Sequence, residues 1–171
     1  MSGDLDRALG QSTAVAALRA GFAEAGIEAW LVGGVVRDAL LGRPLTDVDL
    51  AVAGDVEQAA RVAARALGGP RFPLSERFGG WRALSRDRAV TCDLSPLQGE
   101  TIAADLAQRD FTLNALAVPL AGGAPLDPFG GAADLAAGRL RVLGAAAYDA
   151  DPLRPLRLVR LAAELGMAPD A

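Results

Sequence analysis

The feature that most constrains this chain is an apolar segment running into two adjacent glycines, followed by a segment with two alternate aspartates. The first segment is Leu31–Asp38 (LVGGVVRD) and the second is Thr46–Leu50 (TDVDL). We interpret them as a buried strand, a tight turn, a short helix and a second strand. Gly33 and Gly34 let the backbone come close to a bulky ligand and leave N–H groups free to meet it.

The two aspartates, Asp47 and Asp49, alternate with apolar residues. In a strand they share one face, with Cα atoms roughly 6–7 Å apart, and Val48, Leu50 and Val52 then point toward a core. Two carboxylates at this spacing can jointly hold a pair of divalent ions about 3.5–4 Å apart, as two-metal phosphoryl chemistry requires. A phosphate-accepting turn beside such a pair indicates a nucleoside triphosphate site.

The basic residues are unusual, because all 17 are Arg and the chain contains neither Lys nor His. A Walker-type phosphate loop needs a Lys after its glycines, so that class of site is excluded. Without His, no imidazole can act as a base, nucleophile or metal ligand. Carboxylates, hydroxyls and Arg remain, and a site of hard oxygen ligands favours Mg²⁺ or Mn²⁺.

The charge balance and the apolar content limit the partners and the compartment. With 171 residues, 51% of them hydrophobic, the chain can bury one sizeable core. A net charge of −4 argues against a domain that grips long nucleic acid by itself. The single Cys92 cannot form an intramolecular disulfide, and no apolar run is long enough to cross a bilayer. We therefore expect a cytoplasmic protein with no membrane partner.

Capping and turn signals divide the chain into alternating helices and strands. We expect helices over residues 14–25, 36–41, 55–67, 102–108, 112–116 and 151–164. We expect strands over residues 29–32, 47–53, 72–74, 81–85, 90–94, 117–119 and 140–143, and turns over 122–138. Because several strands follow one another, the pattern predicts an α/β (α+β) fold: a mixed sheet with helices packed on one side.

Two further segments concentrate polar side chains. Residues 108–115 (QRDFTLNA) offer a charged pair, a hydroxyl and an amide for phosphate and sugar. Near the C-terminus Arg154, Arg157 and Arg160 recur every three residues, so in a helix they sweep an arc of about 120°. Asp151 stands at the start of that helix.

Each pattern also has a plainer interpretation. The aspartate pair can be two solvated residues of an edge strand, the diglycine an ordinary turn, and the Arg stripe a solvated helix face. For Asp38 we favour an ion pair with Arg37 at the start of the helix. Asp93, alone in an apolar strand, is either a third carboxylate beside Asp47 and Asp49 or a capping residue before the Ser-Pro that follows.

Taken in this order, the motifs resemble the head domain of class II tRNA nucleotidyltransferases (CCA-adding enzymes) and of their bacterial poly(A) polymerase relatives. The matching segments are Gly33–Asp38, Asp47–Asp49, Arg109–Ala115, the hinge-like stretch 127–135, and Asp151–Arg160. The resemblance implies a nucleotidyltransferase (polymerase β-like) fold. Residues 1–148 would form the head domain, and residues 149–171 would be the start of a helical neck.

The resemblance also implies roles for individual residues. Asp47 and Asp49 would bind the catalytic metals, Mg²⁺ or Mn²⁺, and Asp93 would help to accept a proton or complete the metal shell. The implied nucleotide-binding residues are Gly33, Gly34, Arg37, Arg109, Asp110, Asn114, Asp151, Arg154, Arg157 and Arg160.

Three residues depart from the family pattern. Ala150 stands where a Glu is usual, Gln108 replaces the first Arg of a pair, and Pro155 replaces an aliphatic residue. Ala150 removes a group that supports the Asp–Arg pair of the last helix. Pro155 falls near the first turn of that helix, where a missing N–H costs little.

The reaction implied is attack of an RNA 3′-hydroxyl on the α-phosphate of CTP or ATP, with release of pyrophosphate. The RNA would be a tRNA, or another RNA 3′ end, held by family domains that this chain lacks. The alternatives are a poly(A) polymerase that uses only ATP and an inactive nucleotide-binding module.

Overall fold

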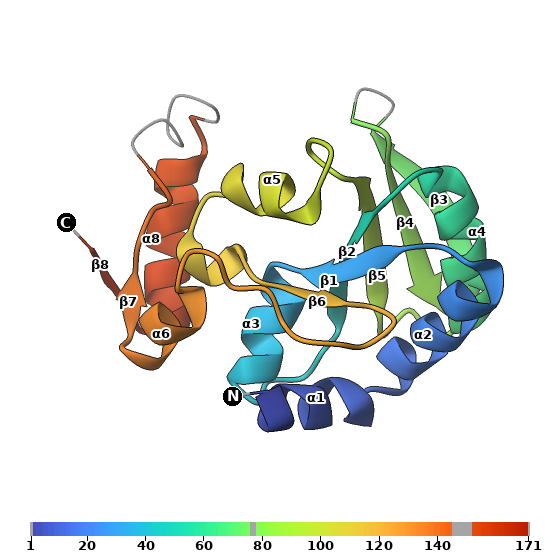
Figure 1. The fold of residues 1–171 in the computed structure, drawn as a ribbon, viewed down its shortest axis with the longest axis horizontal. Helices are drawn as coiled ribbons and strands as arrows, with labels where there is room; N and C mark the ends of the chain where they lie inside the picture. Colours follow the sequence, from blue (N-terminus) through green and yellow to red (C-terminus); the bar gives the residue numbers. More distant parts are fainter. Residues whose placement is uncertain (1, 76–77, 145–151, 171) are drawn as a thin grey trace.

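A six-stranded mixed sheet forms the centre of the computed structural model, which describes residues 2–75, 78–144 and 152–170 (Figure 1). In spatial order the strands are β3 (Gly68–Ser75), β4 (Gly80–Ser85), β5 (Thr91–Pro96), β2 (Asp47–Val52), β1 (Ala29–Val32) and β6 (Ala117–Pro119). Within this sheet, as far as the structure describes it, β2 and β5 pair in parallel and the other four pairings are antiparallel. The mixed sheet expected from the sequence is confirmed.

Four helices build the main core against one face of this sheet. They are α1 (Ser2–Gln11), α2 (Thr13–Ala25), α3 (Gly34–Leu40) and α4 (Val56–Leu67). The short α5 (Ile102–Ala107) lies on the other face, where Leu106 packs near Val32 and Ala51. Figure 1 shows α5 between the sheet and α8, away from α2 and α4. The helix-covered face is therefore mostly core, and the opposite face is left for chemistry.

The alternation predicted for the aspartate strand is present in β2. Val48, Leu50 and Val52 are buried in the main core, whereas Asp47 is exposed and Asp49 only partly buried on the opposite face. Side-chain caps are present at the starts of two helices. Ser12 Oγ accepts the N–H of Val15 at the start of α2, and the Asp55 carboxylate accepts the N–H of Gln58 in α4.

The C-terminal part packs around a separate apolar cluster that contains Phe111, Leu113, Leu135, Leu140 and Leu161. Its elements are η1 (Thr112–Asn114, a 3₁₀ turn), α6 (Gly131–Ala136), β7 (Arg139–Leu140), α8 (Arg154–Leu165) and β8 (Ala168–Pro169). In α8 a proline occupies the first turn, as expected for Pro155.

The sequence interpretation was wrong in several places in this part of the chain. Residues 122–138 are not all turns, because α6 forms there with the Asp127 carboxylate accepting the N–H groups of Gly131 and Ala132. The helix expected over 112–116 is the single 3₁₀ turn η1. The strand expected over 140–143 shortens to β7, with Val142 in an isolated bridge to Phe111.

Two further expectations concern the domain boundary and the membrane. The boundary expected between residues 148 and 149 falls outside the described residues. Among the helices that are described, each is too short or too polar to span a lipid bilayer.

Candidate active site

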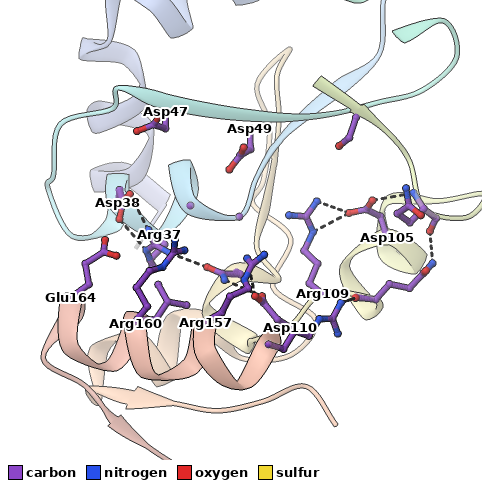
Figure 2. Close-up of a pocket in the computed structure, with 18 residues that line it drawn as sticks. Arg37, Asp38, Asp47, Asp49, Asp105, Arg109, Asp110, Arg157, Arg160 and Glu164 are labelled. Atoms are coloured by element: carbon purple, nitrogen blue, oxygen red, sulfur yellow. Dashed lines mark hydrogen bonds and ion pairs between the residues drawn. The ribbon is translucent and has the colours of Figure 1, made fainter. Parts of the chain in front are cut away.

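A pocket of about 500 Å³ opens between β2, α3, α5 and α8 (Figure 2). It brings together most of the residues selected from the sequence, although they come from distant parts of the chain. Those that line it are Gly33, Gly34, Arg37, Asp47, Asp49, Arg109, Asp110, Asn114, Arg154, Arg157 and Arg160. Asp93 is not in the lining, and Asp151, like Ala150, lies outside the described residues.

The diglycine turn lies at the centre of the pocket. Gly33 has φ of 67°, a left-handed conformation that favours glycine, and it caps α3. A Cβ on Gly33 would lie 3.0 Å from Nη1 of Arg109, and a Cβ on Gly34 would lie 3.6 Å from Oδ2 of Asp49. The missing side chains therefore keep a cation and a carboxylate close to the same backbone turn.

The carboxylates of β2 carry an unfavourable charge arrangement. Burial, together with the nearby carboxylates of Asp93 and Asp47, raises the pKa of Asp49 to about 6 against the opposing pull of Arg109. Asp47 is more exposed and accepts a hydrogen bond of 3.1 Å from the Thr46 hydroxyl. A cation bound beside Asp47 and Asp49 would relieve the repulsion between these carboxylates.

Asp93 lies where the sequence placed it, directly beside Asp49 in the parallel register of β5 and β2. Its carboxylate is engaged, however, because Arg82 on β4 donates to both oxygens at 2.6 and 2.7 Å. The sequence analysis missed Arg82. The pairing of positions 82 and 93 becomes visible only when the register of β4 and β5 is known.

The residues present fit a divalent metal of the magnesium type. Asp47 and Asp49 face the pocket together (Figure 2). No group of three or more His, Cys, Asp or Glu side chains able to hold a metal occurs within the described part of the chain. Water and substrate phosphates must therefore complete the coordination shell, which is how Mg²⁺ is usually held.

Arg37 is buried in the wall of the pocket, and all three of its side-chain nitrogens donate hydrogen bonds to other residues of the protein. Its Nε and Nη2 donate to the two oxygens of Asp38 at 2.9 and 3.0 Å, and its Nη1 donates to Asn114 at 3.0 Å. Asn114 in turn donates to Asp110 at 3.0 Å. The favoured ion pair of Asp38 with Arg37 is therefore present, and Arg37 meets a ligand only through its remaining N–H bonds.

Arg109 is held by a residue that the sequence analysis did not select. The buried carboxylate of Asp105 accepts from its Nε and Nη2 at 3.0 and 2.8 Å and also from the backbone N–H of Gln98. This leaves Nη1 of Arg109 beside Gly33. The spacing of four residues between Asp105 and Arg109, typical of a helical ion pair, was a usable signal for this contact.

Helix α8 closes the pocket opposite β2, and Figure 2 shows Arg157 and Arg160 on it facing the strand that carries Asp47 and Asp49. Nη2 of Arg154 donates to the carbonyl of Gln108 at 2.8 Å. Arg157 forms an ion pair with Asp110. Arg160 has no hydrogen bond or ion pair with any residue that the structure describes. All three arginines of the predicted stripe therefore line the pocket, although Arg157 and Arg160 remain exposed.

Comparison with known proteins gives a consistent picture. The family described as "Poly A polymerase head domain" matches residues 29–93 and 81–141. The chain is 52% identical over 140 residues to the CC-adding tRNA nucleotidyltransferase of Geobacter sulfurreducens, covering 82% of this chain and 33% of that protein. It is 41% identical over 145 residues to the Multifunctional CCA protein of Halorhodospira halophila, covering 80% and 34%. The chain thus spans about one third of these relatives.

The fold is also similar to solved structures. One is a CCA-adding enzyme in complex with CTP, which superposes with a TM-score of 0.86 at 30% sequence identity. The match covers 98% of this chain and 43% of that one.

Proposed function

Because this chain belongs to the poly(A) polymerase head domain family, we propose that it is a metal-dependent nucleotidyltransferase acting on the 3′ end of tRNA. The 3′-oxygen of the RNA forms a bond to the α-phosphorus of a nucleoside triphosphate. The bond from that phosphorus to the bridging oxygen of the β-phosphate breaks, and pyrophosphate leaves.

One observation carries this proposal: Asp47 and Asp49 face Gly33, Gly34 and Arg109 across one pocket. The N–H groups of the turn would bind the triphosphate together with Nη1 of Arg109, which makes no hydrogen bond to any described residue. The two carboxylates would hold Mg²⁺ or Mn²⁺. Bound metal would supply a lowered pKa for the attacking hydroxyl and neutralise charge on the leaving group.

Cytidine addition is the proposed minimal activity. The names of the relatives include both CC-adding and multifunctional CCA proteins, and addition of C is common to the two. Arg157 and Arg160 of α8 would contact the nucleotide from the side opposite β2. We further propose that tRNA is gripped mainly by the parts of the longer relatives that this chain does not match, since its own net charge of −4 disfavours phosphate binding.

The test is metal-dependent incorporation of labelled CTP into a short RNA that ends in the tRNA discriminator base. Wild type should incorporate label only with Mg²⁺ or Mn²⁺, and Asp47→Ala and Asp49→Ala should abolish incorporation while keeping the unfolding transition. Incorporation of ATP alone, in long runs, would instead support a poly(A) polymerase. Nucleotide binding without any incorporation would support an inactive binding module, and undiminished incorporation by either variant would reject the metal assignment.

A further inference from the structure

We propose that an exposed face of strands β3 and β4, formed by Phe72 and Arg82 and called here the β3–β4 face, binds the last nucleotides of the RNA being extended. The inference rests on the proposed function and adds a binding surface for the second substrate. Its occupant is the single-stranded 3′ end of RNA.

The strand register places this face in line with the catalytic carboxylates. Asp49 pairs with Asp93, Asp93 pairs with Arg82, and Arg82 pairs with Phe72. Side chains of directly paired residues lie on the same face of a sheet. One row of side chains therefore crosses four strands, from the metal-binding strand to the edge strand. This row lies on the face of the sheet opposite the main core. Ala83 and Cys92, the chain neighbours of Arg82 and Asp93, point into that core.

The row has the length that a substrate strand needs. Neighbouring strands are about 4.8 Å apart, so Phe72 lies roughly 14 Å from Asp49, three strands away. The terminal ribose must reach the carboxylates for its 3′-hydroxyl to react. Phe72 therefore meets a base upstream of the terminal one, and Arg82 lies where the connecting phosphates pass.

The chemistry of the face suits single-stranded RNA. Phe72 is 41% exposed and offers a ring on which a base can stack. The side chain of Arg82 is 36% exposed, and it donates hydrogen bonds to Asp93 through Nε and Nη2 alone. Nη1 of Arg82 makes no hydrogen bond within the described residues, so it can donate to a phosphate. The pairing with Asp93 fixes the direction of the guanidinium.

The geometry of the reaction selects the same side. In an in-line displacement the attacking oxygen and the leaving group lie on opposite sides of the phosphorus. The proposed triphosphate site lies toward α3 and α8, so the attacking RNA must arrive from the other side of Asp49, over β5, β4 and β3. Figure 1 shows α8 at one end of the molecule and β3 and β4 at the other.

The experiment compares Phe72 variants with RNA primers of two lengths, a dinucleotide too short to reach Phe72 and a longer strand. With the longer primer, Phe72→Ala should raise the KM for RNA about tenfold, the lower range of base–aromatic stacking, with the KM for CTP unchanged. Phe72→Trp should retain the wild-type KM and Phe72→Leu should not. The dinucleotide should show no difference. Arg65→Ala, at an exposed position of α4 behind the sheet, is the control for a substitution away from this face.

A second measurement needs no turnover. RNA carrying a photoreactive thiouridine at the third nucleotide from its 3′ end, one position beyond the reach of a dinucleotide, should crosslink to β3 or β4 in wild type, and the crosslink should be lost in Phe72→Ala. Crosslinks confined to α8, or an RNA KM that Phe72→Ala leaves unchanged in an active protein, would overturn the β3–β4 face. Absence of incorporation by wild type would count against the proposed function instead, and the crosslink would still decide the binding surface.

Discussion

Asp110 lies 2.9 Å from Arg157, and this ion pair ties the loop before η1 to helix α8 across the pocket. The Asp110 side chain is 7% exposed and that of Arg157 is 48% exposed. The other Asp110 oxygen already accepts from the N–H of Phe111 and from Asn114. Asn114 also binds Arg37, so one polar chain links the wall that would hold the triphosphate to the helix that would face the base.

The first prediction concerns this pair. Arg157→Ala should lower the free energy of unfolding by about 1–2 kcal/mol, because it leaves a buried Asp110 oxygen without a partner. Urea unfolding at neutral pH measures the change. Arg160→Ala is the matched control: it lies one turn further along α8, has no partner among the described residues, and should change stability by less than about 0.5 kcal/mol. Equal losses in both variants would show that the ion pair adds nothing.

The second prediction concerns pH and the metal-free protein. Asp49 has a folded pKa of about 6, above the unfolded value of about 3.9, so ionising it costs stability in the folded state. Below about pH 4 the group is protonated in both states and costs nothing. The cost grows between pH 4 and 6 and is complete above pH 6.

In the presence of a chelator, Asp49→Asn should therefore stabilise the protein by about 1–3 kcal/mol at pH 7.5 and have little effect near pH 4. Denaturant unfolding at a series of pH values gives the curve. Asp47→Asn, at the exposed position of the same strand, provides the comparison. A stabilisation by Asp49→Asn that is independent of pH would contradict the explanation by charge.

The third prediction separates the two arginines near the diglycine turn. Arg109→Ala should weaken binding of ATP with Mg²⁺ by about 1.5–3 kcal/mol, the scale of a charge-assisted hydrogen bond. Arg37→Ala should weaken it similarly and also destabilise the fold, because Arg37 is buried and binds Asp38 and Asn114. Calorimetry and thermal unfolding measure the two effects.

Arg61→Ala, on the far side of the sheet in α4, is the control for loss of one positive charge. Unchanged nucleotide affinity in both the Arg37 and the Arg109 variants would reject the pocket as the triphosphate site.

Much of the fold follows from local rules that the sequence displays directly. The alternation in β2 places Asp49 and Leu50 on opposite faces of the sheet, independently of the other strands and helices. The Asp55 cap acts within one turn of its own helix. The same holds for Gly33, whose need for a left-handed conformation is local. These features were predictable because the energy that determines them comes from neighbours in the chain.

Apart from the local pair of Asp105 with Arg109, the missed features depend largely on partners that are distant in the chain. Arg82 is informative only beside Asp93, and that pairing is a matter of strand register. Helix α6 has six residues, too few to show a period, and is stabilised by Asp127 and by packing on η1. Gly131 shows how close that packing is, since a Cβ there would meet the backbone of Thr112.

The final prediction concerns the choice of base by α8. Asp151, outside the described residues, and Arg154 at the start of the helix would act as a pairing edge, because a carboxylate only accepts hydrogen bonds and a guanidinium only donates them. Cytosine and adenine each present an amine donor beside a ring nitrogen acceptor and match this edge. Guanine and uracil present the reverse order. A mismatch leaves buried polar groups unpaired, which costs several kcal/mol, so CTP and ATP should bind and GTP and UTP should not.

The measurement is competition of all four nucleotides against a fluorescent CTP analogue, in wild type, Asp151→Ala and Arg154→Lys. Wild type should prefer CTP over GTP by about a hundredfold, which corresponds to roughly 2.7 kcal/mol. Asp151→Ala should remove most of that preference.

Arg154→Lys keeps the positive charge but loses the planar guanidinium that binds Gln108 and would bind the base. This variant should therefore weaken the binding of the cytosine base more than the binding of the triphosphate. The resemblance implies that a Glu at position 150 supports the Asp–Arg pair, so with Ala150 the preference should be smaller than in relatives with the Glu. Equal affinity of wild type for CTP and GTP would reject selection by this pair while leaving the metal site untouched.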